Sequence, residues 1–282
     1  MKRIYLVYAL VTFFAYTLSA HQACAHGVAG NRYFPPTITV DDPYAANEAH
    51  VILGRPINLG LPSTNLNSSN QVQLGVGIEP FDGFGIALDG VYRTNNPNLS
   101  TQNNGFDNLA YSIKKELTIN DTHEFAISLG MNGQIGNSGS NGSTSANSYM
   151  PTLFYAKGFG DLPESLSILK PLAVTGTIGY QFSNDASQPN LLNFGFTLQY
   201  SYQYLHNFVE RSELSKLLDR FIAVVEFPMQ SCLTGICSGQ IIGSINPGLV
   251  WVGPQFNVNA QVIFPVNNYS GSGMGVLFQI HK

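Results

Sequence analysis

The sequence predicts an all-β protein, a transmembrane antiparallel up-and-down β-barrel of about twelve strands with a short periplasmic amphipathic helix, from three observations. Apolar and polar residues alternate over many strand-length segments, charged residues make up only 11% of the chain, and the first residues have the pattern of an export signal. A typical soluble domain carries about a quarter charged residues. The alternation predicts two-faced strands, so the question is which face meets water.

Residues 254–266 pose that question most clearly. Every even position from Phe256 to Val266 is apolar, and the odd positions from Gln255 to Gln261 are glutamine or asparagine. Successive side chains of a strand point to opposite faces. A soluble β-sandwich, the structural alternative, usually carries charged residues on its outward faces. The polar faces here are mostly Asn, Gln, Ser, Thr and Gly, which favours lipid on the even face and a wet lumen on the odd face.

The same alternation recurs along the chain and predicts the individual strands. The longest apolar face lies in residues 191–205, and it is long enough to cross a hydrocarbon layer as a tilted strand. It ends in Tyr200, Tyr202 and Tyr204, where an aromatic girdle would meet the membrane–water boundary. The predicted strands span residues 50–60, 71–80, 84–95, 106–118, 123–132, 148–158, 170–181, 191–205, 221–230, 240–252, 254–266 and 273–281.

The connectors between these strands alternate in kind. Tight turns are expected near residues 81–83, 120–122 and 253–254, and the polar connectors span residues 61–70, 96–105, 133–147, 182–190, 231–239 and 267–272. With an even strand number and both barrel ends in the periplasm, the polar set falls outside the cell. Two longer inner connectors predict helix. Residues 161–169 carry Pro163 early, and residues 206–220 are amphipathic.

The start of the chain predicts export. Lys2 and Arg3 precede an apolar run from Ile4 to Leu18, and an A-x-A site follows at residues 23–25. This is the pattern of a secretory signal peptide over residues 1–25. The apolar run is about 15 residues, short of the roughly 20 that a membrane anchor needs. Lipidation at Cys24 is disfavoured because no apolar residue stands three places before it.

Residues 26–48 do not alternate and form a separate N-terminal segment. They are rich in proline and aspartate, with Arg32-Tyr33-Phe34 and Asp41-Asp42-Pro43. Three interpretations stay open: the segment inserts into the barrel as a plug, binds a periplasmic partner, or hangs free. The barrel itself is assigned to residues 49–282.

Two cysteines remain after signal removal, Cys232 and Cys237. Export takes the chain into an oxidising compartment, where a close pair of thiols forms a disulfide. Four intervening residues make a small closed loop that suits a hairpin end. A metal site is the weaker alternative, because no histidine or further cysteine lies nearby in sequence.

Charged and amide side chains opposite the apolar faces are the candidate lumen lining. Glu226 is the most informative of them, because its predicted lumen neighbours Ile222, Val224 and Pro228 are apolar and a carboxylate there needs a partner. The charges either form a selectivity lining of mixed sign or pair across strands and block a narrow barrel. The candidates are Glu79, Asp89, Arg93, Glu124, Glu226, Asn193, Gln199, Gln203, Asn257 and Gln261, with Lys114 and Glu116 as further members.

Other classes of function find little support in the residues. A net charge of −4 does not suggest a nucleic-acid partner. The histidines at positions 26, 50, 123, 206 and 281 accompany no catalytic serine motif, and solvated turn histidines are the simpler interpretation. Their scatter argues against a metal centre. We therefore expect a non-enzymatic chain without cofactor, whose partners are outer-membrane lipid and a small solute.

Several long blocks also resemble a known family. They are "HGVAGNRYFPPTITVDDPYAANE", "FYAKGFGDLPESLSILKPLAVTGTIGY", "NFGFTLQYSYQYL", "VVEFPMQ", "INPGLVWVGPQFNVNAQVIFPVN" and "GMGVLFQIHK". They are similar to a family of proteobacterial outer-membrane β-barrels, related to transporters and porins of the phenol-degradation (meta-pathway) type. The resemblance spans most of the mature chain. It implies an outer-membrane barrel and points to hydrophobic or aromatic solutes.

The residues and the resemblance together favour a passive outer-membrane channel or transporter for small solutes. The alternative is a non-transporting structural or adhesive barrel that works through its Asn- and Ser-rich outer loops. An open lumen would separate the first from the second.

Overall fold

Twelve long strands account for most of the residues that the structure, a computed structural model, describes: 27–55, 70–94, 104–140, 144–211, 213–271 and 273–282. The predicted signal peptide lies outside these residues. The long strands are β3 (Glu48–Arg55), β4 (Asn70–Phe81), β5 (Phe84–Thr94), β7 (Ala110–Asn120), β8 (Phe125–Gln134), β9 (Ser148–Gly158), β10 (Leu172–Ser183), β11 (Leu191–Ser201), β12 (Phe221–Cys232), β13 (Ile241–Val252), β14 (Asn257–Pro265) and β15 (Gly275–His281).

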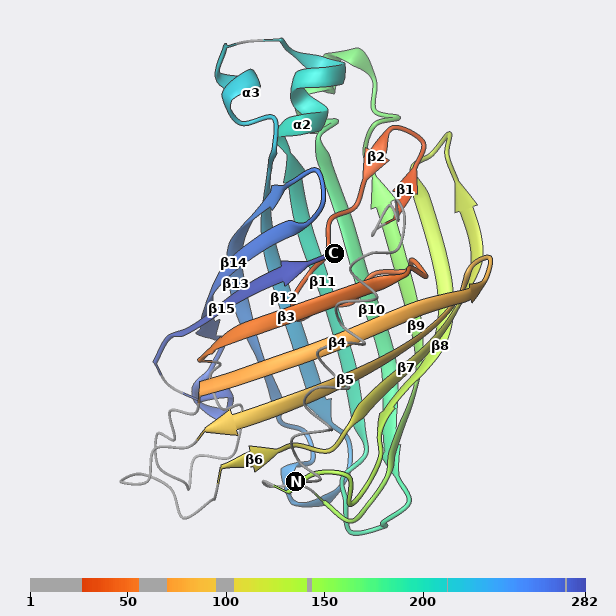
Figure 1. The fold of residues 1–282 in the computed structure, drawn as a ribbon, viewed down its shortest axis with the longest axis vertical. Helices are drawn as coiled ribbons and strands as arrows, with labels where there is room; N and C mark the ends of the chain where they lie inside the picture. Colours follow the sequence, from red (N-terminus) through yellow and green to blue (C-terminus); the bar gives the residue numbers. More distant parts are fainter. Residues whose placement is uncertain (1–26, 56–69, 95–103, 141–143, 212, 272) are drawn as a thin grey trace, which may run out of the picture.

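These strands form a closed antiparallel barrel (Figure 1). Each long strand pairs with the next long strand along the chain, and the last strand, β15, pairs with the first, β3, so that His281 lies opposite His50. The short strand β6 (Gly105–Phe106) extends the pairing of β5 beyond the point where β7 leaves it. Closure leaves no free edge, so the backbone groups of the wall are satisfied within the wall.

Alternation along the strands separates an inner from an outer face, as the sequence predicts. On β15 the odd positions are buried and the even positions Val276, Phe278 and Ile280 are 40–54% exposed. On β14 the odd positions Asn257, Asn259 and Gln261 are buried, and Val262 and Phe264 face outward. The even face of residues 256–266 is therefore the outer, apolar face, which suits contact with lipid.

The two ends of the barrel differ. One end has the tight turns between β4 and β5, β7 and β8, and β13 and β14, together with the start of β3 and the end of β15. We call this end periplasmic because short turns mark that side of such barrels. The same end carries the helical connectors η1 (Glu164–Leu169), α2 (Tyr202–Tyr204), η2 (Leu205–Val209) and α3 (Glu213–Leu217), at the top of Figure 1. Among the described residues, no helix is both long and apolar enough to cross a membrane.

The predicted helices form, but residues 202–205 correct the sequence analysis. The expected helix at 161–169 is the 3₁₀ helix η1, and the amphipathic helix expected over 206–220 is shorter, as α3. Strand β11 ends at Ser201, whose side chain caps the next turn by accepting a hydrogen bond from Tyr204 N at 3.1 Å. Gln203 is therefore helical rather than a strand residue lining the lumen, and Tyr204 is buried rather than part of an aromatic girdle.

The predicted disulfide is present in the loop between β12 and β13. Cys232, the last residue of β12, is bonded to Cys237 at the end of the short 3₁₀ helix η3 (Gly235–Cys237). Their Cα atoms lie 5.7 Å apart. The bridge pins an outer loop at the end of the barrel opposite the helices.

Residues 27–47, which we call the N-terminal segment, pack against the inner face of the barrel. The segment begins with a small hairpin of β1 (Val28–Ala29) and β2 (Arg32–Tyr33). Its apolar side chains join three clusters with wall residues. Phe34 and Tyr44 lie with Ala29, Ala126, Ala156 and Ala173, Ile38 packs on Ile52, Ile263 and Leu277, and Tyr33 packs on Ile222, Val224 and Val250.

Candidate functional site

Amide side chains of the inner wall hold the middle of the N-terminal segment. They come from the polar, odd-numbered face of β14, which the sequence assigns to the lumen, and from β13. Their Nδ2 atoms donate to the segment at three points: Asn246 to Thr39 Oγ1 at 3.0 Å, Asn257 to Tyr33 Oη at 3.1 Å and Asn259 to the Pro36 carbonyl at 3.3 Å.

Glu226 is the polar centre of this contact. Its side chain is fully buried, and its carboxylate accepts hydrogen bonds from the backbone N–H groups of Ile38, Thr39 and Val40 at 2.7–2.8 Å and from Thr39 Oγ1 at 2.6 Å. Gln261 donates a further hydrogen bond from the wall. The sequence singles out Glu226 as a carboxylate among apolar neighbours that needs a partner, and the segment supplies one. Hydrogen bonds to an ionised group are stronger than neutral ones.

Lys114 of β7 holds the second half of the segment. Its Nζ donates to Asp41 Oδ1 at 3.1 Å and to the carbonyls of Asp42 and Tyr44 at 2.5 and 3.2 Å, and it lies 4.6 Å from the centre of the Phe154 ring. An ammonium group has three N–H donors, so the segment uses all of the donor capacity of Lys114.

Arg32 closes the periplasmic end of the lumen. It is 1% exposed, its Nε donates to Glu124 Oε2 at 3.1 Å, and one guanidinium N–H donates to the Pro171 carbonyl at 2.8 Å. The guanidinium also stacks over the ring of Tyr204, 3.9 Å from its centre. Burial and the nearby Glu124 carboxylate raise the pKa of Tyr204 to about 12. This tyrosine therefore stays neutral, and its ring packs against the guanidinium of Arg32.

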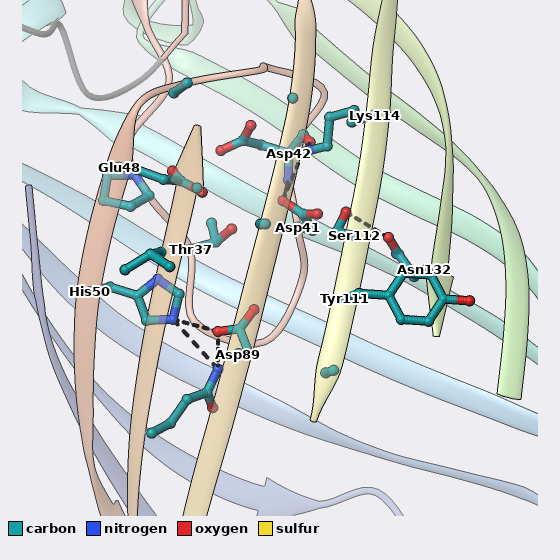
Figure 2. Close-up of a pocket in the computed structure, with 18 of the residues that line it drawn as sticks. Thr37, Asp41, Asp42, Glu48, His50, Asp89, Tyr111, Ser112, Lys114 and Asn132 are labelled. Atoms are coloured by element: carbon teal, nitrogen blue, oxygen red, sulfur yellow. Dashed lines mark hydrogen bonds and ion pairs between the residues drawn. The ribbon is translucent and has the colours of Figure 1, made fainter. Parts of the chain in front are cut away.

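A cavity of about 350 Å³ lies between the N-terminal segment and the strands β3, β4, β5, β7, β8 and β15. Figure 2 shows Glu48, His50 and Asp89 facing it, with Asp41, Asp42 and Lys114 across from them. The lining reaches from segment residues 36–46 to Gln134, Ser148 and Gln181, at or near the loop-side ends of β8, β9 and β10. The segment thus forms the floor of a chamber on the outer side of the lumen.

Two histidine–carboxylate pairs line this cavity where β3 meets its neighbours. His50 Nε2 lies 2.9 Å from Asp89 Oδ1, and His281 Nε2 lies 3.2 Å from Glu48 Oε2. Gly75 lies between the strands of the first pair. A Cβ atom at this position would come within 2.2 Å of the His50 ring and 2.3 Å of Asp89 Oδ1. The missing side chain therefore lets His50 reach across β4 to Asp89.

Asp42 is a buried carboxyl of the segment. Burial, together with the nearby carboxylates of Asp41 and Glu48, raises its pKa to about 7 against the lowering effect of Lys114. Its Oδ1 accepts a hydrogen bond from Tyr44 N at 2.9 Å. Near neutral pH, this side chain exchanges its proton more readily than an ordinary aspartate would.

The other predicted lumen residues are spread along the barrel rather than gathered at one site. Asp89 lines the cavity. Away from it, Glu79 accepts from Gly83 N at 2.7 Å at the periplasmic turn, and Arg93 Nε donates to Asp107 Oδ2 at 2.5 Å near the outer end. Three further side chains make wall-to-wall or wall-to-segment bonds: Asn193 with Gln181 and Gln230, Gln199 with Thr175, and Glu116 with Ala45 N.

The structure adds residues that the sequence analysis did not select. The interpretation of the histidines as solvated turn residues is wrong for His50 and His281, which line the cavity and pair with carboxylates. His281 is only 4% exposed, because odd positions of β15 face inward. Strand alternation would have placed His281 on that inner face. No pattern in the sequence links Arg32 to Glu124, which lie 92 residues apart.

Comparison with known proteins identifies the fold. No model of a known protein family matches the chain, and no curated protein matches it in sequence. Among solved structures, a "NanC porin" aligns with a TM-score of 0.51 and 12% identity over 83% of this chain and 97% of its own. A "KdgM porin" gives 0.50 and 11% over 83% and 97%, and an outer membrane channel from Pseudomonas putida F1 gives 0.51 and 9% over 88% and 99%.

These likenesses define the class of protein. At this level of identity they establish the fold, which is that of outer-membrane porins and channels.

In the part of the chain that the structure describes, no group of three or more His, Cys, Asp and Glu side chains could hold a metal ion.

Proposed function

We propose that this chain is an outer-membrane channel for small solutes, whose path through the barrel is obstructed by its own N-terminal segment. The single observation that carries the proposal is the lumen itself. A closed barrel encloses a chamber of about 350 Å³, and the N-terminal segment, which lies inside the barrel and is not part of its wall, forms the floor of that chamber. A barrel that serves only as a scaffold has no need of such a chamber.

The contacts of the segment are of a kind that can be broken and remade. It is held by hydrogen bonds to Glu226, by Lys114 and Arg32, and by three small apolar clusters. In the described part of the chain no disulfide joins it to the wall. When the segment leaves, the polar groups that it satisfied would face a water-filled lumen and be hydrated there. We therefore propose that the segment is a plug rather than a permanent part of the core.

The residues that line the chamber indicate the polarity of the solute. The resemblance to transporters of the phenol-degradation type implies hydrophobic or aromatic solutes. Carboxylates, histidines and amides around the chamber instead favour a polar solute, because an apolar one would leave these groups without water or partners. We propose a small polar solute, with aromatic compounds as the competing class.

The experiment cross-links the N-terminal segment reversibly to the barrel wall and records whether current passes. Thr39→Cys and Asn246→Cys replace two side chains that hydrogen-bond at 3.0 Å, and a short bis-methanethiosulfonate reagent joins the two thiols reversibly. Single-channel currents are recorded from residues 26–282 in a planar bilayer. We expect the joined protein to be silent and the protein treated with reductant to show discrete steps. Each single-cysteine variant and the parent chain, given the same reagent and reductant, are the matched controls.

Equal conductance in the joined and released forms would show that the segment does not obstruct the path. Complete silence of well-inserted protein in every form, including one without residues 27–47, would reject the channel. It would favour the structural or adhesive barrel.

A further inference from the structure

The chamber on the outer side of the N-terminal segment has an excess of acidic groups. Its lining contains four carboxylates, one lysine and two histidines. With both histidines neutral, the carboxylates outnumber the single lysine even when Asp42, whose pKa is about 7, is protonated. The carboxylates are Asp41, Asp42, Glu48 and Asp89.

The cations of the lining are already engaged. Lys114 Nζ makes its three hydrogen bonds to the segment, His50 faces Asp89, and His281 faces Glu48. An incoming anion would have to break one of these contacts to find a positive partner. The chamber is therefore poorly suited to an anionic ligand.

An unused acceptor lies in the same lining. Gln279 of β15 is 2% exposed and borders the chamber, and its Oε1 accepts no hydrogen bond from any described residue. A buried amide oxygen without a partner is costly, unless water or a ligand supplies an N–H or O–H donor. His281, His50 and Asp89 lie at the same level of the barrel, because strand pairing aligns them across β15, β3, β4 and β5. Gln279 is the next inward-facing residue of β15 toward the outer end of the barrel.

We propose that this chamber is a binding site for a small polar solute that carries a protonated amine. The ammonium group lies toward the Asp89 carboxylate, and an N–H or O–H of the solute donates to Gln279 Oε1. His50 and Gln73 both contact Asp89 through Oδ1, at 2.9 and 3.0 Å, and the side chain is 24% exposed, so the solute is placed at Oδ2. A volume of about 350 Å³ accommodates a solute of the size of a monosaccharide. This inference rests on the proposed channel function and names its solute class.

The test compares three small polyhydroxy compounds: glucosamine, a cation at pH 7, glucose, which is neutral, and gluconate, an acyclic anion. Binding to residues 26–282 in lipid nanodiscs is measured by isothermal titration calorimetry at pH 7. We expect glucosamine to bind about tenfold more tightly than glucose, and gluconate not to bind. Calorimetry needs no current, so a failed binding site and a failed channel give separate results.

Two variants and one control locate the site. Asp89→Asn keeps a hydrogen-bonding side chain but removes the charge, and should weaken glucosamine binding about tenfold. Gln279→Glu replaces the amide acceptor by a carboxylate, which adds a negative charge to the chamber lining and should tighten glucosamine binding. Asp107→Asn is the matched control, because Asp107 forms a lumen ion pair with Arg93 outside the chamber lining. Folding of each variant is checked by the mobility shift of unheated samples in SDS gels.

Three results would overturn the proposal. They are equal binding of glucosamine and glucose, preferential binding of gluconate, and no binding of any of the three compounds. If Asp89→Asn does not fold, unchanged glucosamine affinity in folded Gln279→Glu would likewise reject it.

Discussion

At the scale of single residues, Glu226 links the barrel wall to the segment. The sequence marks it as a carboxylate among Ile222, Val224 and Pro228, and the structure surrounds it with donors from residues 38–40. Three consecutive backbone N–H groups form a concave donor set that favours a negative charge. One side chain therefore fixes the position of a segment more than 180 residues away in the sequence.

Glu226→Gln tests this role. The amide NH₂ of glutamine would face backbone donors and lose the charge-assisted bonds, for a net cost of about 3 kcal/mol. We expect the amides of residues 38–40 to exchange hydrogen about a hundredfold faster, measured by mass spectrometry. Glu164→Gln is the control, because Glu164 is 84% exposed in its pair with Lys170. Unchanged exchange at residues 38–40 would mean that Glu226 does not hold the segment.

At the scale of elements, the strands were predictable and the segment was not. Alternation locates β9 at residues 148–158 as observed and places the other long strands within a few residues, except that residues 56–60 of the first predicted strand lie outside the described residues. It fails at residues 202–205, because tyrosines at even spacing look like a continued strand while Ser201 caps a helical turn. The N-terminal segment has no period, so its path depends on which wall positions leave room for it.

Small wall residues make that room. Ala126, Ala156 and Ala173 lie under Phe34 and Tyr44, and each is about 1% exposed. From the sequence, these alanines are ordinary inward-facing residues of their strands. Only the structure shows that their small size leaves space for the segment.

Ala156→Leu should displace the segment while leaving the barrel intact. Overpacking of a filled site costs about 1–3 kcal/mol, and here the loosely held partner is the segment rather than the hydrogen-bonded wall. Cysteine introduced at Thr37 should then react with a maleimide several-fold faster than in the parent. Ala260→Leu, on the exposed outer face of β14, is the matched control. Equal reactivity in all three backgrounds would contradict the packing argument.

At the scale of the whole molecule, the wall and the segment are stabilised by different interactions. The wall is a continuous antiparallel ladder closed by the pairing of β15 with β3. The segment pairs only with itself, between β1 and β2, and otherwise binds through side chains and isolated backbone groups. Closed pairing is what allows a β-structure to remain in lipid without a free edge.

The barrel should therefore fold without the segment. Residues 48–282 are expected to give the same mobility shift in unheated SDS gels and the same β-sheet circular dichroism as residues 26–282. Their unfolding temperature should be lower, because three apolar clusters lose the side chains that the segment contributes. A chain that gives no shifted band would show that the segment is part of the folding core rather than an addition to it.

The sequence by itself determined the wall: twelve two-faced strands, the apolar face that points outward, the distribution of turns and loops, and the disulfide between Cys232 and Cys237. These features are local, since a period of two and a short loop are read within about ten residues. Only the tertiary structure decided what fills the lumen. Arg32 meets Glu124, Thr39 meets Glu226, and His50 meets Asp89 across Gly75. Such contacts depend on barrel closure and strand register, which bring together side chains whose spacing along the chain carries no pattern.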